Sequence, residues 1–96
     1  MHTDGIITVD ATLNFDSGHK EVWLKIEDSS CFLTPDEAHS LADAVDSKSD
    51  FAIKQVAIGW TPDGALRVIL GDSAAHPSVS LFFADWLREA AEEAER

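Results

Sequence analysis

The sequence predicts an α+β fold in the order β-β-α-β-β-α, with a four-stranded antiparallel sheet and two helices on one face. Three observations support this prediction. Residues 7–15 alternate between apolar and polar side chains, residues 35–47 carry a capped helical pattern, and residues 51–96 repeat the hairpin-then-helix plan of residues 3–47. A chain of 96 residues suits one domain. The two halves therefore suggest a pseudo-twofold repeat within a single domain.

The first hairpin is predicted from strict alternation on either side of a turn. Asp16–His19 supplies turn residues, and Gly18 can adopt a positive φ. Alternation places one set of side chains on a buried face and the other on a solvated face. The expected buried side chains are Ile7, Val9, Ala11, Leu13, Phe15, Val22, Leu24 and Ile26.

The first helix is predicted at residues 35–47. Thr34 suits the N-cap, Pro35 the first helical position, and Glu37 completes a capping box. Apolar side chains then recur at helical spacing and form one stripe, which faces the core: Ala38, Leu41, Ala42 and Val45.

The second half is predicted from weaker signals. Alternation between Phe51 and Trp60 changes phase, which suggests a bulge near Gln55. The Thr61–Gly64 segment is typical of a type I turn, and residues 65–71 resume as a strand. A helix is expected from about Ser78, on the spacing of Val79, Phe82, Phe83, Trp86 and Ala90.

Composition excludes several functional classes. The chain has 18 acidic and 7 basic residues and a net charge of −11, which argues against direct nucleic-acid binding and against binding to an anionic membrane. Cys31 is the single cysteine, so the chain cannot form an internal disulfide. With no signal-peptide pattern and no long apolar stretch, we expect a cytoplasmic protein.

Catalytic, metal and cofactor motifs are absent from the sequence. Cys31 precedes a helix N-terminus, where the dipole could lower its pKa, and His76 holds the corresponding place in the second half. A pocket near these two residues would make the protein a small-ligand binder or a minor enzyme. However, the four histidines show no metal-binding spacing, the glycines form no phosphate-binding loop, and Cys31 lies in no nucleophile motif. We therefore expect no enzymatic activity, no metal and no cofactor.

An interaction surface is predicted on the sheet face that the helices leave open. Trp23 lies in the polar phase of its strand beside Lys25, so the alternation directs it away from the core. Tryptophan is enriched at the centres of protein interfaces, although this one could instead be an edge residue covered by a neighbouring strand. The face would bind another protein or a second copy in a homodimer through Trp23, Lys25, Thr8, Asp10, Thr12, Arg67 and Ile69.

A second candidate surface is acidic. Asp36, Glu37, Asp43 and Asp46 fall on the first predicted helix, and the C-terminal helix ends in several glutamates. Such a surface can simply keep a protein soluble, or it can steer association with a basic partner. A sharper alternative is an acidic mimic of nucleic acid that inhibits a DNA- or RNA-binding protein.

The segment from Phe32 to Val45, with the sequence FLTPDEAHSLADAV, resembles a stretch common in small proteins of actinobacteria and their phages. This resemblance implies a phage or accessory bacterial gene product that binds and modulates a host protein. Together with the charge and the outward Trp23, it favours a non-catalytic interaction or modulator domain whose partner is a protein of basic character.

Overall fold

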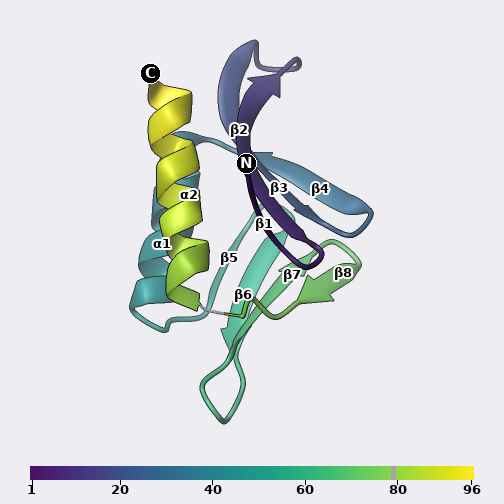
Figure 1. The fold of residues 1–96 in the computed structure, drawn as a ribbon, viewed down its shortest axis with the longest axis vertical. Coiled ribbons are helices and arrows are strands. Elements are labelled where there is room, and N and C mark those ends of the chain that lie inside the picture. Colours follow the sequence, from purple (N-terminus) through teal and green to yellow (C-terminus); the bar gives the residue numbers. More distant parts are fainter. Residues whose placement is uncertain (79) are drawn as a thin grey trace.

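The computed structural model describes residues 1–78 and 80–96, and it shows an α+β protein with two antiparallel sheets and two helices (Figure 1). Each sheet has four strands in sequential order, β1-β2-β3-β4 and β5-β6-β7-β8. The elements are β1 (His2–Asp4), β2 (Ile7–Asn14), β3 (His19–Ile26), β4 (Ser29–Leu33), α1 (Pro35–Asp46), β5 (Phe51–Ile53), β6 (Val56–Trp60), β7 (Leu66–Leu70), β8 (Ser73–Ala75) and α2 (Ser80–Glu95).

The prediction of one four-stranded sheet is wrong, because each half of the chain forms a complete sheet of its own. The strands β1, β4 and β8 were missed, and β5 was merged with β6 into one predicted strand from Phe51 to Trp60. The phase change near Gln55 is a tight turn rather than a bulge, with Lys54 at a φ of 53°. Ile53 pairs with Val56 across this turn, so two residues three apart face the same side.

The four-strand-then-helix unit occurs twice, and its turns match. The β1–β2 and β5–β6 turns have Gly5 and Lys54 at positive φ, and the β3–β4 and β7–β8 turns have Glu27 and Gly71 at positive φ. Ser29 and Ser73 directly follow the latter pair of turns, and their Oγ atoms lie 3.2 Å apart. A contact between equivalent residues is what a local twofold relation between the repeats produces.

The helix predicted at 35–47 is confirmed as α1, with Ser47 as its C-cap. Thr34 Oγ1 accepts from the Glu37 amide at 3.2 Å, and Glu37 Oε1 accepts from the Thr34 amide at 2.8 Å. This reciprocal pair satisfies two amides that an uncapped helix would leave unbonded. The second helix begins at Ser80 instead of about Ser78, and Val79 lies outside the described residues.

Buried side chains from both sheets and both helices form one hydrophobic cluster. The helices pack against each other, α2 lies along β2 and β3, and α1 contacts β5 (Figure 1). Leu13 and Phe15 were expected in the core, but their exposed fractions are 43% and 88%. They lie at the end of the β2–β3 hairpin, which extends beyond the helices in Figure 1.

Each repeat also supports the start of the other repeat's helix. Asp4, at the β1–β2 turn, accepts bonds from the Ser78 amide at 2.7 Å and the Ser78 hydroxyl at 3.1 Å. Lys54, in the β5–β6 turn, bonds Glu37 Oε1 at 2.7 Å beside the start of α1. Neither described helix is long and apolar enough to cross a bilayer.

Candidate functional site

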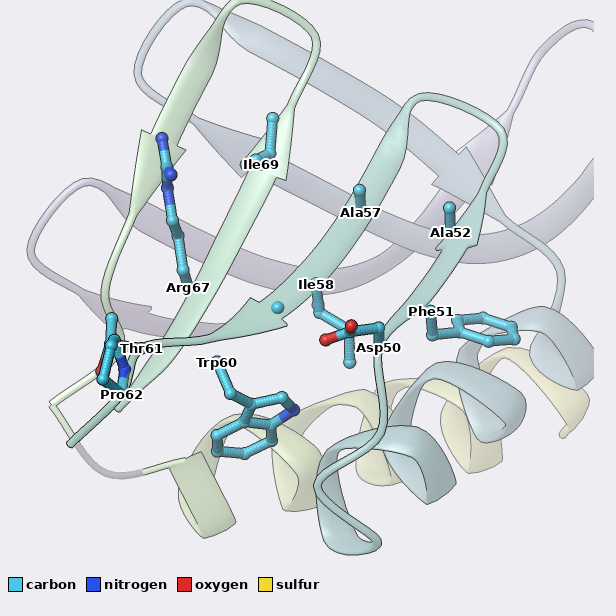
Figure 2. Close-up of a pocket in the computed structure, with 11 residues that line it drawn as sticks. Asp50, Phe51, Ala52, Ala57, Ile58, Trp60, Thr61, Pro62, Arg67 and Ile69 are labelled. Atoms are coloured by element: carbon cyan, nitrogen blue, oxygen red, sulfur yellow. The ribbon is translucent and has the colours of Figure 1, made fainter. Parts of the chain in front are cut away.

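The outward face of the second sheet carries a groove with a volume of about 780 Å³ (Figure 2). We call it the second-sheet groove. It is formed by β5, β6, β7 and the segments at their ends. Its lining residues are Asp50, Phe51, Ala52, Ala57, Ile58, Gly59, Trp60, Thr61, Pro62, Arg67 and Ile69.

The groove exists because the outward-facing residues of two adjacent strands that form it, β5 and β6, have small side chains or none. Strand residues alternate between the two faces of a sheet, and Phe51, Ile58 and Val68 turn toward the core. The outward positions between them are Ala52, Ala57 and Gly59. Alanine and glycine cover little of the sheet surface, so the backbone of β6 forms an open floor.

Gly59 is not required by the local backbone. It lies inside β6, and it is absent from the glycines with a positive φ. A Cβ placed on Gly59 would meet only Asp50 Oδ1, at an ordinary contact distance of 3.8 Å. Glycine in a strand interior is less favourable than alanine and often marks a close approach by another molecule. The fold therefore leaves room here that it does not itself use.

One end of the groove is bounded by an immobilised aromatic ring. Trp60 packs partly against the hydrophobic core, and its indole Nε1 donates to the Ser49 carbonyl oxygen at 3.2 Å. Figure 2 shows the ring at the foot of β6, beyond the floor of the groove. A tryptophan held in this way offers apolar area without a further loss of side-chain freedom on binding.

Charge in the groove comes from Arg67 and Asp50, both of which are exposed. Three other basic side chains form ion pairs with acidic ones: Lys20 with Glu93, Lys54 with Glu37, and Arg88 with Asp43 and Asp46. Within the described part of the chain, Arg67 makes no ion pair, and the same is true of Lys25, Lys48 and Arg96. Its guanidinium is therefore an available donor group on the wall of the groove.

The predicted interaction residues do not share one face. Arg67 and Ile69 line the second-sheet groove, whereas Thr8, Asp10, Thr12, Trp23 and Lys25 lie on the outward side of the first sheet. None of these five residues lines the second-sheet groove. Trp23 lies between Asp10 and Phe32 in the strand register, and Lys25 Nζ lies 5.9 Å from the centroid of the Trp23 ring.

The acidic residues predicted on the first helix are partly neutralised within the molecule. Asp36 is exposed, but Arg88 bonds Asp43 at 2.8 Å and Asp46 at 2.6 Å. Burial alone would raise the pKa of Glu37, but its bonds to Lys54 and to the Thr34 amide outweigh that effect and lower it. The charge of −11 is therefore not concentrated on α1.

Cys31 lies in β4 and His76 follows β8, and what the structure shows of them gives the predicted pocket little support. Burial raises the pKa of the Cys31 thiol, which opposes the activation expected from the helix dipole. Counted from the β3–β4 and β7–β8 turns, the equivalent of Cys31 is Ala75, and His76 Nδ1 lies 3.1 Å from the Leu66 carbonyl oxygen. Neither residue lines the second-sheet groove.

A smaller pocket of about 210 Å³ lies where the first two strands meet the end of α2. His2 stacks on Trp86 with ring centroids 5.3 Å apart, and its Nε2 lies 2.6 Å from Glu89 Oε2. Its side chains already bond one another, so the pocket offers a ligand less than the groove does. Among the described residues, no group of histidine, cysteine and acidic side chains is arranged to hold a metal ion.

The sequence analysis placed Arg67 and Ile69 on an outward face but did not single out the small residues of the floor, Ala52, Ala57 and Gly59. A signal was present in the sequence, because Ala57 and Gly59 alternate with Val56, Ile58 and Trp60 in a strand whose opposite phase is apolar and large. No protein-family model, curated protein or solved structure matches this chain.

Proposed function

We propose that this protein is a non-catalytic interaction domain of the cytoplasm, which binds a segment of another protein in the second-sheet groove. The observation that carries the proposal is the open floor formed by Ala52, Ala57 and Gly59, with the hydrogen-bonded Trp60 ring at one end of the groove. An apolar hollow with a few polar groups at its rim is typical of recognition surfaces.

The net charge of −11 affects how fast a charged partner approaches, and it does not arise from the residues that line the groove. Arg67 and Asp50 balance each other within the groove, so the excess acid lies elsewhere on the surface. A field of one sign accelerates the approach of an oppositely charged protein and is screened by salt. We therefore propose a partner whose surface around the bound segment is basic, and whose association rate falls as ionic strength rises.

The alternative of nucleic-acid mimicry has less support from the geometry. A mimic needs a run of unpaired acidic side chains spaced like phosphates, whereas Glu37, Asp43 and Asp46 each contact a lysine or an arginine. The ligand-binding alternative near Cys31 also has less support, because the groove lies on the outward face of the other sheet.

Site-specific photo-cross-linking in the cells that produce the protein tests the proposal. The photoreactive residue p-benzoylphenylalanine is placed at Ile69 in the groove and, as a matched control, at Lys25. Counted back from Leu70 and Ile26, these two positions are equivalent in β7 and β3. We expect a discrete adduct with another protein from Ile69 and none from Lys25.

Three outcomes would contradict the proposal. Absence of any protein adduct from Ile69 would show that the groove does not bind a protein. Equal labelling from both positions would show non-specific contact. An adduct of twice the chain mass would show that the protein binds its own copy, which would replace the partner by a homodimer.

A further inference from the structure

We infer that the second-sheet groove binds a lysine or arginine side chain of the partner, with its charged head on Asp50 and its apolar stem along the alanine floor. This inference rests on the proposed function, and it adds the chemistry of the bound segment. Three features carry it: the carboxylate beside Gly59, the row of small apolar residues next to it, and the acidity of the whole chain.

The carboxylate of Asp50 lies beside the bare backbone of Gly59. The register of β5 with β6, extended by one pair beyond Phe51 and Ile58, places Asp50 opposite Gly59. Apart from its chain neighbours, a Cβ on Gly59 would have one atom within 4 Å, which is Asp50 Oδ1 at 3.8 Å. Figure 2 shows the side chain of Asp50 turned toward β6. A group that binds on Gly59 therefore meets a carboxylate oxygen.

Asp50 is also the polar side chain of the groove that remains available at this place. The Trp60 indole and the Thr61 hydroxyl are already hydrogen-bonded within the protein. Figure 2 shows the head group of Arg67 beside β8 and away from Asp50. Within the described residues, Asp50 forms no ion pair. An ionised carboxylate accepts hydrogen bonds and donates none, so the group that binds it must be a donor.

A row of apolar residues lies next to this carboxylate. Ala52, Ala57 and Ile69 are paired across β5, β6 and β7. They line the groove two residues along the strands from Asp50 and Gly59, a separation of roughly 7 Å. Lysine and arginine each have a long apolar stem that ends in a charged head. Such a side chain can cover the apolar row with its stem and place its head on Asp50.

A positive charge on the bound side chain is favoured by electrostatics. A cationic donor forms a shorter and stronger bond to a carboxylate than a neutral donor does. In a protein with a net charge of −11, a cation is also attracted by the surrounding acidic residues, whereas an anion is repelled. The charge complementarity thus extends from the whole chain to the one carboxylate beside Gly59, and it favours a basic side chain over a neutral or acidic one.

Selection from a displayed library of random peptides at physiological salt tests the inference. Basic peptides also bind an acidic protein without specificity, so peptides that bind the Gly59→Val variant are removed first. This variant keeps the net charge of the wild type but fills the space over residue 59. We expect the peptides that still bind the wild type to share a lysine or an arginine. Changing that residue to norleucine, which has an alkyl stem without the charge, should lower the affinity at least about tenfold.

Asp50→Asn is the corresponding change in the protein, because asparagine keeps the shape of the side chain and removes its charge. It should also lower the affinity of the selected peptides at least about tenfold. Asp28→Asn is the matched control, since it removes the same charge from an exposed aspartate in the β3–β4 turn. It should change the affinity less than about twofold. Circular dichroism and thermal unfolding confirm that each variant is folded before its binding is compared.

Several results would overturn the inference. These are the absence of peptides that prefer the wild type to Gly59→Val, preferred peptides without a basic residue, unchanged binding to Asp50→Asn, and an equal loss of affinity in Asp50→Asn and Asp28→Asn. If cross-linking at Ile69 still identifies a partner protein in such a case, the proposed function stands and only the basic side chain on Asp50 fails. If cross-linking also fails, both proposals fall.

Discussion

The two repeats share a backbone plan but differ in what their sheets present to solvent. Counted from matching turns, Asp10 and Trp23 in the first repeat correspond to Gly59 and Arg67 in the second. The first sheet therefore carries a side chain, Asp10, at the position where the groove on the second sheet has the bare backbone of Gly59. The same arrangement of strands thus presents different outward surfaces, depending on a few residues.

Inward positions do not differ in this way. Ile7, Val9, Leu24 and Ile26 in the first sheet correspond to Val56, Ile58, Val68 and Leu70 in the second, and all eight are buried aliphatic residues. Both inner faces contribute to one hydrophobic cluster. Residues on both faces must therefore be apolar and must pack closely in the core. The outward faces carry no such requirement and are free to diverge toward function.

The largest expected effect tests whether the repeats are one folding unit. Phe83 in α2 is fully buried, and it is part of the cluster that both sheets share. Phe83→Ala should lower the free energy of unfolding by about 3–5 kcal/mol through lost burial and a new cavity. Chemical denaturation followed by circular dichroism and by tryptophan fluorescence should give coincident transitions. Separate transitions would show that the first repeat survives the loss of the second.

The next prediction compares the N-termini of α1 and α2, which the two repeats stabilise in different ways. Thr34 caps α1 locally, whereas Asp4 from the first repeat holds Ser78 ahead of α2. Thr34→Ala and Asp4→Ala should each cost about 1 kcal/mol. Hydrogen exchange distinguishes them: the first should expose the beginning of α1, and the second the beginning of α2. If Asp4→Ala leaves α2 protected, its bonds to Ser78 contribute nothing to that helix.

A smaller effect of opposite sign is expected at Gly59. Gly59→Ala should raise the free energy of unfolding by roughly 0.5–1 kcal/mol, because alanine suits a strand interior better and the added Cβ meets no clash. Thermal unfolding measures the change. Gly18→Ala is the contrasting variant, since Gly18 has a φ of 75° and alanine there is strained. Destabilisation by Gly59→Ala would mean that the fold itself needs this glycine.

The smallest expected effect concerns pH and the bond between the repeats at Glu37. The pKa of Glu37 is lowered in the folded protein, so its ionisation stabilises the fold above its unfolded value of about 4.3. This contribution is lost as the pH falls through the lower, folded pKa. Glu37→Gln should therefore cost at most about 1 kcal/mol near neutral pH and approach zero in acid. Urea titrations at several pH values measure the difference, and a cost independent of pH would exclude the ionic contribution.

Local signals in the sequence were sufficient for some elements. The helix α1 was predicted from Thr34, Pro35 and Glu37, because the bonds of a capping box join residues only three apart. The alternation of residues 7–15 likewise identified β2 and the buried residues Ile7, Val9 and Ala11, although Leu13 and Phe15 are exposed. Arg67 and Ile69 were placed on an outward face for the same reason.

Strand pairing and surface shape depended on the tertiary structure. Alternation shows which way a side chain points, but not which strand lies beside it, so one sheet and two sheets were equally compatible with the pattern. The exposure of Phe15 depends on where the helices end, and the contact between Ser29 and Ser73 joins residues 44 positions apart. The groove likewise requires small residues from separate strands to lie together. The periodicity of the chain thus determined the local elements and their inner faces, whereas packing between distant segments decided the two sheets and the open site.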